Sequence, residues 1–233
     1  MNMMPYILNI DTATEVCSVA ISNGTEIFFE RIETKGPSHA SILGVFVNDA
    51  IKTLRKENKI LDAIAVSCGP GSYTGLRIGV SEVKGLCYGF NIPLIAINTP
   101  LIMASAVAKS KNVDKNTLLC PMIDARRMEV YAAIYDSELS VVRNIQADIV
   151  DNDTYAGFLS ENKVAFFGNG AAKCRESINN DNAIFIDNIY PKASDMISLA
   201  LDKYEKQLFE DVAYFEPFYL KEFITTIPKK KVL

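Results

Sequence analysis

VSCGPGSYTGLRIG, at residues 66–79, is the segment around which the rest of the chain is organised. An apolar strand from Ala63 to Val66 runs into a turn rich in glycine and proline, and an apolar-periodic segment follows at once. The sequence therefore predicts a strand, a sharp turn and a helix. Ser72 or Thr74 is the expected N-cap, because a short hydroxyl can accept a hydrogen bond from the first free amides of a helix.

Glycines recur along this predicted helix at intervals of four residues, in two groups. The first group is Gly71, Gly75 and Gly79, and the second is Gly85 and Gly89. Each glycine costs about 1 kcal/mol relative to alanine inside a helix, so their number needs a compensating reason. Two reasons stay open: the close approach of another backbone, or of a ligand that carries phosphate.

Two known phosphate-binding loops do not fit the stretch. A Walker A loop, G-x-x-x-x-G-K-[ST], is excluded because Thr74 stands five residues after Gly69 and no Lys-Ser or Lys-Thr pair follows. A dinucleotide loop, G-x-G-x-x-G, is excluded because its third glycine arrives one residue late, at Gly75.

The composition is that of an ordinary globular protein. The chain has 233 residues, 49% of them hydrophobic and 22% charged, which is enough for one large domain or two small ones. The formal net charge of −4 argues against a stand-alone nucleic-acid binder, because such proteins normally present a basic surface. Any contact with RNA is therefore expected to be local or assisted by a partner.

The expected location is the cytoplasm. Five scattered cysteines without a C-x-x-C pair predict buried free thiols rather than disulfides. The N-terminal residues lack the basic and apolar regions of a signal peptide. The most apolar run, Asn91–Ala108, is interrupted by Pro93, Asn98 and Pro100, so it predicts a buried strand and helix rather than a membrane span.

The order of predicted elements repeats, which favours a duplicated α/β domain. Each half is expected to read βββαβαβα, and Ile10–Ile21 aligns without a gap with Ile123–Ile134. The predicted units are residues 1–110, residues 111–208 and a tail at 209–233. In the first half we expect strands at Tyr6–Asp11, Val16–Ser22, Glu26–Glu33, from Ala63, and at Leu94–Ile97, with helices at Ser38–Leu54, about Thr74–Phe90 and about Thr99–Lys109. In the second half we expect strands at Leu118–Asp124, Glu129–Tyr135, Leu139–Arg143, Val164–Phe167 and Ile184–Ile186, with helices at Asn152–Leu159, from about Ala171, and at about Ser194–Gln207.

The predicted helix at Ser38–Leu54 is more apolar than one buried face requires. Ile42, Val45 and Ile51 extend its apolar surface beyond a single face. A second protein partner and a deeply buried helix explain this equally well.

Candidate chemistry is sparse. Asp11 with Thr12 and Thr14 fits a hairpin that cradles phosphate and metal. The matching turn of the second half carries Arg126 and Arg127 instead of glycines, and we favour a structural ion pair of one of them with Asp124.

The single histidine, His39, excludes H-E-x-x-H zinc sites and any other two-histidine ligand set. His39 is expected to cap or flank the start of its helix. The cysteines lack a histidine near them in sequence, so a cysteine nucleophile is unsupported.

Four segments together resemble the bacterial TsaB (YeaZ) family. They are Ile10–Ala13, Gly69–Gly79, Ile123–Tyr131 and Pro217–Leu220. The resemblance implies an actin-like (ASKHA, ribonuclease H-like) fold and a role in making threonylcarbamoyladenosine next to the anticodon of tRNAs that read codons beginning with A. It further implies TsaC as the source of threonylcarbamoyl-adenylate, TsaD as the transferase and direct partner, and the ATPase TsaE as a member of the assembly.

The resemblance also implies that the chain is an accessory subunit without activity of its own. TsaD carries an H-x-x-x-H metal site, and its two histidine positions fall here on Thr99 and Met103, which are not competent ligands. No metal and no cofactor of its own are expected, although ATP at an interface shared with TsaD is compatible with the resemblance, and tRNA is expected to bind through the complex.

The leading hypothesis is a TsaD partner that uses the two helices beginning near Ser38 and Thr74, whose face also pairs two copies as a homodimer when TsaD is absent. An ATP-dependent kinase or ATPase of the same fold is the alternative, and a metallopeptidase is largely dismissed for want of ligands. The predicted partner interface comprises Ile42, Val45, Phe46, Asp49, Gly71, Tyr73, Thr74, Gly75, Ile78, Gly79, Glu82 and Leu86. The predicted vestigial phosphate site comprises Asp11, Thr12, Thr14 and Gly69.

Overall fold

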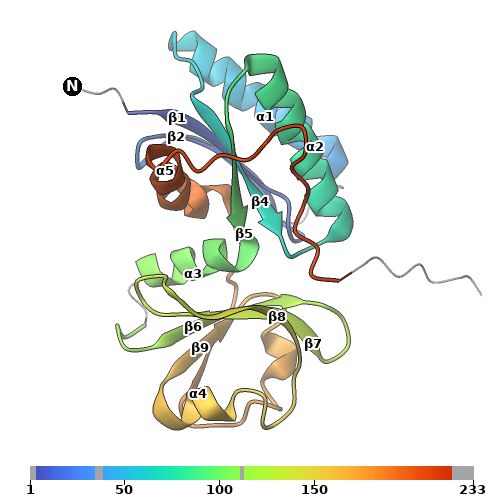
Figure 1. Ribbon diagram of the computed structural model, residues 1–233, viewed down its shortest axis with the longest axis vertical. Coiled ribbons are helices and arrows are strands. Elements are labelled where there is room, and N and C mark those ends of the chain that lie inside the picture. Colours follow the sequence, from blue (N-terminus) through green and yellow to red (C-terminus); the bar gives the residue numbers. More distant parts are fainter. Residues whose placement is uncertain (1–3, 35–38, 111–112, 222–233) are drawn as a thin grey trace, which may run out of the picture.

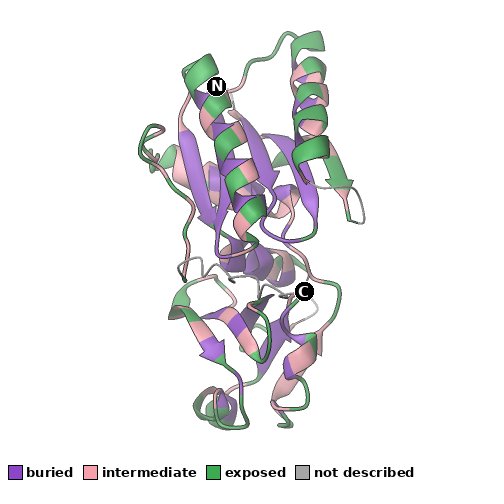
Figure 2. Ribbon diagram, turned by 90° about the vertical axis from the view of Figure 1, so that its right-hand side faces the viewer, coloured by how far each residue is buried: buried purple, intermediate pink, exposed green. Residues whose placement is uncertain are grey.

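A computed structural model of the chain describes residues 4–34, 39–110 and 113–221. It contains two five-stranded mixed sheets, which lie one above the other along the long axis of the molecule (Figure 1). Figure 2 shows that the central strands of both sheets are buried, whereas edge strands and the outer faces of the helices are partly or fully exposed.

The first sheet has the strand order β3-β2-β1-β4-β5. Its first three strands form an antiparallel meander, and β4 and β5 add to β1 in parallel. The elements of this half are β1 (Tyr6–Asp11), β2 (Cys17–Asn23), β3 (Glu26–Glu33), α1 (His39–Lys56), β4 (Ala63–Gly69), α2 (Tyr73–Phe90), β5 (Leu94–Asn98) and α3 (Thr99–Lys109).

The second sheet repeats this order as β10-β9-β6-β7-β8, so β6 to β10 take the places of β1 to β5. The repeated α/β organisation predicted from the sequence is confirmed. The elements are β6 (Leu118–Asp124), β7 (Glu129–Tyr135), β8 (Val141–Ile149), α4 (Ala156–Glu161), β9 (Val164–Phe167), the 3-10 turn η1 (Ala172–Cys174), β10 (Ala183–Ile186), the 3-10 turn η2 (Ala193–Met196) and α5 (Ile197–Glu205).

Two predicted helices differ from the structure or lie partly outside it. The helix expected from Ala171 is only the single turn η1, because the residues that follow, Ser177-Ile178-Asn179-Asn180, are weak helix formers. The helix expected from Ser38 is α1, but Ser38 itself lies outside the described residues.

Helices cover both faces of the first sheet. On one face Leu43 and Val47 of α1 and Val83 of α2 pack in a common core with the strands. On the other face Met196 of η2 and Ala200 of α5 pack against the same sheet.

The last helix of each half packs against the sheet of the other half. Helix α3 follows the first sheet in the sequence, but its Met103 and Val107 join the core of the second sheet. Helix α5 follows the second sheet and packs on the first. Figure 1 shows α3 between the two sheets and α5 beside the upper one.

The apolar run Asn91–Ala108 forms β5 and most of α3, as predicted. No helix within the described residues is both long enough and apolar enough to span a membrane. All five cysteines are buried free thiols, which confirms the prediction made from their spacing.

Candidate protein–protein interface on α1 and α2

The glycine-bearing stretch forms the predicted strand, turn and helix. Strand β4 ends at Gly69, whose φ of 114° suits glycine, and a cis peptide bond joins it to Pro70. Helix α2 begins at Tyr73, and the Ser72 hydroxyl accepts a hydrogen bond of 3.2 Å from the amide of Gly75. Ser72 is therefore the N-cap.

The first glycine group packs against the turn between β1 and β2. A Cβ added to Gly71, Gly75 or Gly79 would come within 3.0 Å of the carbonyl oxygens or hydroxyl of Thr12 and Ala13. The Thr12 hydroxyl donates a hydrogen bond of 2.8 Å to the carbonyl of Gly75. The reason for these glycines is thus the close approach of the same chain: backbone carbonyls at Gly71 and Gly75, and the Thr12 side chain at Gly79.

This packing corrects the predicted interface, since Gly71, Gly75 and Gly79 contact the β1–β2 turn and do not present a bare face to a partner. Tyr73 of the predicted interface is half-buried and contacts the tail. Its ring packs on Tyr219 of the tail, with ring centroids 4.9 Å apart.

The tail after α5 runs along one side of α2. The amide of Phe218 donates to the carbonyl of Cys68 at 2.7 Å, and the Lys84 ammonium donates to the carbonyls of Ala213 and Phe215 at 3.0 and 2.9 Å. These contacts cover the side of α2 that faces away from α1.

His39 is the first residue of α1, which confirms that it flanks the start of its helix. Its Nε2 lies 2.6 Å from the carbonyl oxygen of Thr14. The β1–β2 turn is therefore attached to the N-terminal ends of both α1 and α2.

Asp11 lies at the end of β1 with no exposed surface, and neither carboxylate oxygen has a hydrogen-bond partner among the described residues. Burial raises the pKa of the Asp11 carboxyl from its ordinary value of 3.8 to about 7. The nearby Asp195 carboxylate adds to this rise.

The four residues of the predicted phosphate site are brought close to one another but are buried. Thr12 is fully buried, Thr14 is 5% exposed, and the Thr14 hydroxyl accepts from the amide of Val16 at 3.4 Å. Gly69 is buried beside the backbone of Phe218. Phosphate binding at this turn stays a prediction.

The matching turn in the second half pairs differently from the prediction. Asp124 forms its ion pair with Lys173 of η1, and not with an arginine. Arg126 contributes only its backbone amide, which donates to Asp124 Oδ1 at 2.9 Å. Arg126 and Arg127 both have positive φ values, and both are exposed.

Thr99 and Met103 are fully buried at the start of α3. Across residues 4–34, 39–110 and 113–221, no group of three or more His, Cys, Asp and Glu side chains could hold a metal ion.

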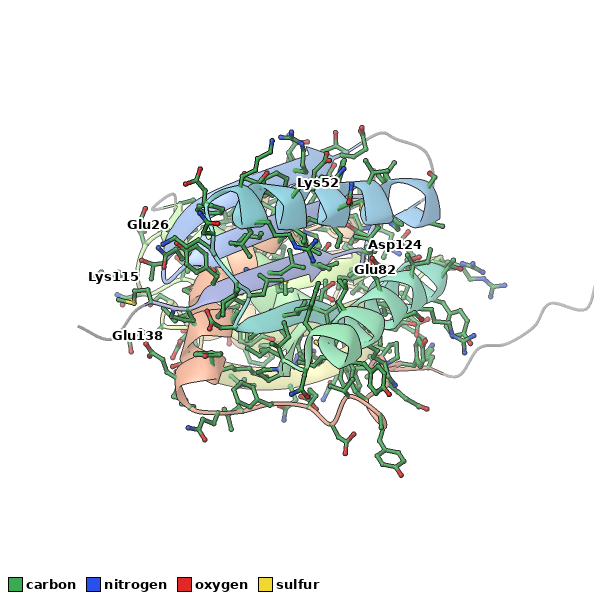
Figure 3. All side chains as sticks on the ribbon, turned by 90° about the horizontal axis from the view of Figure 1, so that it is seen from above. Glu26, Lys52, Glu82, Lys115, Asp124 and Glu138 are labelled. Atoms are coloured by element: carbon green, nitrogen blue, oxygen red, sulfur yellow. The ribbon has the colours of Figure 1, made fainter. Side chains whose placement is uncertain are left out.

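The remaining predicted interface residues lie where α1 and α2 run side by side on the first sheet (Figure 3). Val45 of α1 is 55% exposed, although it is apolar. Around it, half-buried or exposed side chains follow helical spacing on both helices. On α1 they are Ile42, Phe46 and Asp49, and on α2 they are Thr74, Ile78, Glu82 and Leu86.

The second glycine group belongs to this face. Ile78, Glu82, Gly85 and Gly89 recur at i, i+4, i+7 and i+11, so they form one stripe along α2. A Cβ on Gly85 or Gly89 would meet nothing within 4 Å. The sequence prediction did not include these two glycines in the interface. The two groups differ in their position along the helix: Gly71, Gly75 and Gly79 lie at its N-terminal end against the β1–β2 turn, whereas Gly85 and Gly89 lie near its C-terminal end, beyond the reach of that turn.

Comparison with known proteins places this arrangement in a family. The profile of the family described as TsaD: tRNA N6-adenosine threonylcarbamoyltransferase matches residues 33–229. The Escherichia coli "tRNA threonylcarbamoyladenosine biosynthesis protein TsaB" is 36% identical over 57% of this chain and 55% of that protein. The TsaB protein of Buchnera aphidicola subsp. Baizongia pistaciae is 28% identical over 94% of this chain and 100% of that protein.

A solved structure from Pseudomonas aeruginosa, described as similar to peptidase YEAZ, has a TM-score of 0.81 and 25% identity, with 94% of this chain and 100% of that chain covered. The chain belongs to the TsaD family and, within it, to the TsaB (YeaZ) group. The actin-like α/β fold expected from the sequence is thereby confirmed. The matches to the E. coli and Bacillus subtilis TsaB proteins span only 55% and 60% of those proteins.

The two glycine groups predict opposite effects on stability. Gly75→Ala is expected to lower the free energy of unfolding by about 3 kcal/mol, because its methyl group would overlap the Thr12 carbonyl. Gly85→Ala is expected to raise it by about 1 kcal/mol, because alanine is the better helix former and the site is open. Urea denaturation of both variants checks this, and equal effects of the two substitutions would contradict the assigned packing.

Asp11 predicts a pH dependence of stability. Because the folded-state pKa of about 7 exceeds the unfolded value of 3.8, its contribution is fully present below 3.8 and is lost as the pH rises to about 7. The loss over that interval is on the order of 4 kcal/mol. Asp11→Asn is expected to remove this dependence, so the variant gains stability relative to the wild type between pH 4 and pH 8. Parallel stability curves for the two proteins would show that Asp11 is not buried as described.

Proposed function

We propose that this TsaB-group chain acts in tRNA threonylcarbamoyladenosine biosynthesis as a non-catalytic partner of a TsaD-type threonylcarbamoyltransferase. The names of its TsaB relatives support the pathway. The product is the modified adenosine next to the anticodon of tRNAs that read codons beginning with A. TsaE joins the assembly, TsaC supplies the activated threonylcarbamoyl group, and tRNA binds through the complex.

The observation that carries the partner role is the open glycine stripe on α2. Gly85 and Gly89 each cost about 1 kcal/mol relative to alanine, and nothing in the chain approaches them. Because glycine has no side chain, a helix of a second protein can come closer to the α2 backbone at an uncovered glycine than at a residue of any other type. The exposed Val45 and half-buried Phe46 of α1 supply apolar surface beside the stripe. The same face can pair two copies of this chain when the transferase is absent.

The buried state of Asp11 supports an accessory role over the alternative of an ATP-dependent kinase or ATPase. Such an enzyme needs an ionised carboxylate that reaches magnesium and phosphate. Asp11 has no exposed surface, and burial raises its pKa towards neutrality.

Gly85→Leu is the direct test of the partner role. The side chain is expected to fill the space that a partner helix needs, and thus to weaken the complex with the TsaD-type transferase by at least about thirtyfold. Isothermal titration calorimetry of the two purified proteins measures this.

Gly44→Leu is the matched control. Gly44 is also an exposed helical glycine with nothing within 4 Å, but on α1 it lies about 200° around the helix from Phe46. It is expected to leave the affinity unchanged. A wild type that forms no complex, or a Gly85→Leu variant that binds as tightly as Gly44→Leu, would refute the proposed interface.

A further inference from the structure

The turn between β6 and β7 holds two consecutive arginines in an unfavourable conformation. Arg126 and Arg127 have φ values of 72° and 46°, which lie in the left-handed region that favours glycine and asparagine. Both are exposed, and neither side chain has a hydrogen bond or ion pair among the described residues. The left-handed backbone at Arg126 and Arg127 costs conformational free energy, and their exposed side chains do not repay it within the fold. This indicates that the side chains bind something outside the chain.

Within the described part of the chain, two acidic groups next to this turn, Asp124 and Glu129, are paired with lysines and form no salt bridge with the arginines, whereas the Glu15 carboxylate has only a neutral amide partner and keeps its charge. Lys173 pairs with Asp124 and also donates to the carbonyl of Glu129 at 2.7 Å. Lys221 of the tail pairs with the Glu129 carboxylate. Glu15 of the β1–β2 turn accepts from the Asn169 side chain at 3.3 Å.

A cluster of two tyrosine rings and one guanidinium lies between the tail and α2, next to Lys221, which pairs with Glu129 after the turn. Two residues before Lys221, Tyr219 packs on Tyr73, with ring centroids 4.9 Å apart and planes inclined by 36°. The Arg77 guanidinium lies 4.3 Å from the centre of the Tyr73 ring and donates to the Tyr219 hydroxyl at 3.2 Å. Arg77 is exposed.

Free arginines beside a stack of aromatic rings and a guanidinium match the chemistry of single-stranded RNA. Arginines bind the phosphates, and unpaired bases stack on tyrosine rings and guanidinium planes. The alternative partner is a protein with a carboxylate-rich surface. Such a surface would pair with the arginines, but it would leave the contact of Arg77, Tyr73 and Tyr219 unexplained. The local charge also agrees with a chain whose net charge of −4 excludes a basic surface overall.

We infer that the Arg126–Arg127 turn and the adjoining stack of Arg77, Tyr73 and Tyr219 bind the sugar-phosphate backbone and unpaired bases of RNA. The inference rests on the proposed function, because it gives this chain its own contact with the tRNA substrate. It adds a second binding surface, separate from the stripe on α2.

The test measures binding of an unmodified tRNA transcript to the full chain, alone and in complex with the TsaD-type transferase, over a series of salt concentrations. Arg126→Gln/Arg127→Gln is expected to weaken binding at least about tenfold at 0.1 M salt and to reduce the slope of log K against log salt by about 1.5. Lys115→Gln/Lys163→Gln removes the same charge at the opposite end of β6 and is expected to change the affinity less than about twofold.

A second pair of substitutions separates RNA binding from folding. Arg126→Asn/Arg127→Gly places favoured residues in the left-handed turn, so it is expected to raise the melting temperature while it weakens RNA binding as the glutamine pair does. A merely structural role of the arginines would not give these two changes together.

Calorimetric binding of the transferase to the same variants keeps the two proposals distinguishable. Arginine variants that bind the transferase normally but lose RNA support the inference, whereas failure of the wild type to bind the transferase refutes the proposed function alone. The inference is overturned if wild-type protein does not bind the transcript, or if the arginine variants bind it normally. It is also overturned if the arginine variants lose affinity for the transferase but keep their affinity for the transcript. Displacement of the RNA by magnesium–ATP, with one ATP bound for each RNA released, would overturn it as well.

Discussion

The structure depends on the close packing of the β1–β2 turn against the first turns of α2. Only glycine at positions 71 and 75 leaves room for the backbone carbonyls of Ala13 and Thr12, and only glycine at position 79 leaves room for the Thr12 hydroxyl. The same turn receives His39 at the start of α1, through the carbonyl of Thr14. One compact junction thereby fixes the positions of both helices on the first sheet and presents their outer faces together.

Local signals in the sequence predicted the strand, turn and helix around Gly69 and the repeated order of elements. Those signals could not assign the glycines, because the neighbour of Gly75 is Thr12, 63 residues upstream. The same limit explains Tyr73, whose partner Tyr219 comes from the tail. The helix expected from Ala171 is only one turn long for a local reason, because the serine and asparagines at 177–180 are weak helix formers.

The two halves have kept one topology while their corresponding turns have diverged. In the first half the turn is covered by α1 and α2, and Asp11 behind it is buried without a partner. In the second half the turn is open and carries two exposed arginines. A buried first turn accords with a chain that supports catalysis elsewhere, and an exposed second turn accords with contact to an anionic substrate.

The central claim is that the face formed by α1 and α2, and not the glycine junction beneath it, receives the partner. Amide hydrogen exchange of the chain, with and without the TsaD-type transferase, tests it most directly. Slower exchange is expected in the complex at residues 42–49 and 82–89, with no change at the β1–β2 turn, residues 12–16. Protection at residues 12–16 without protection on the two helices would contradict it.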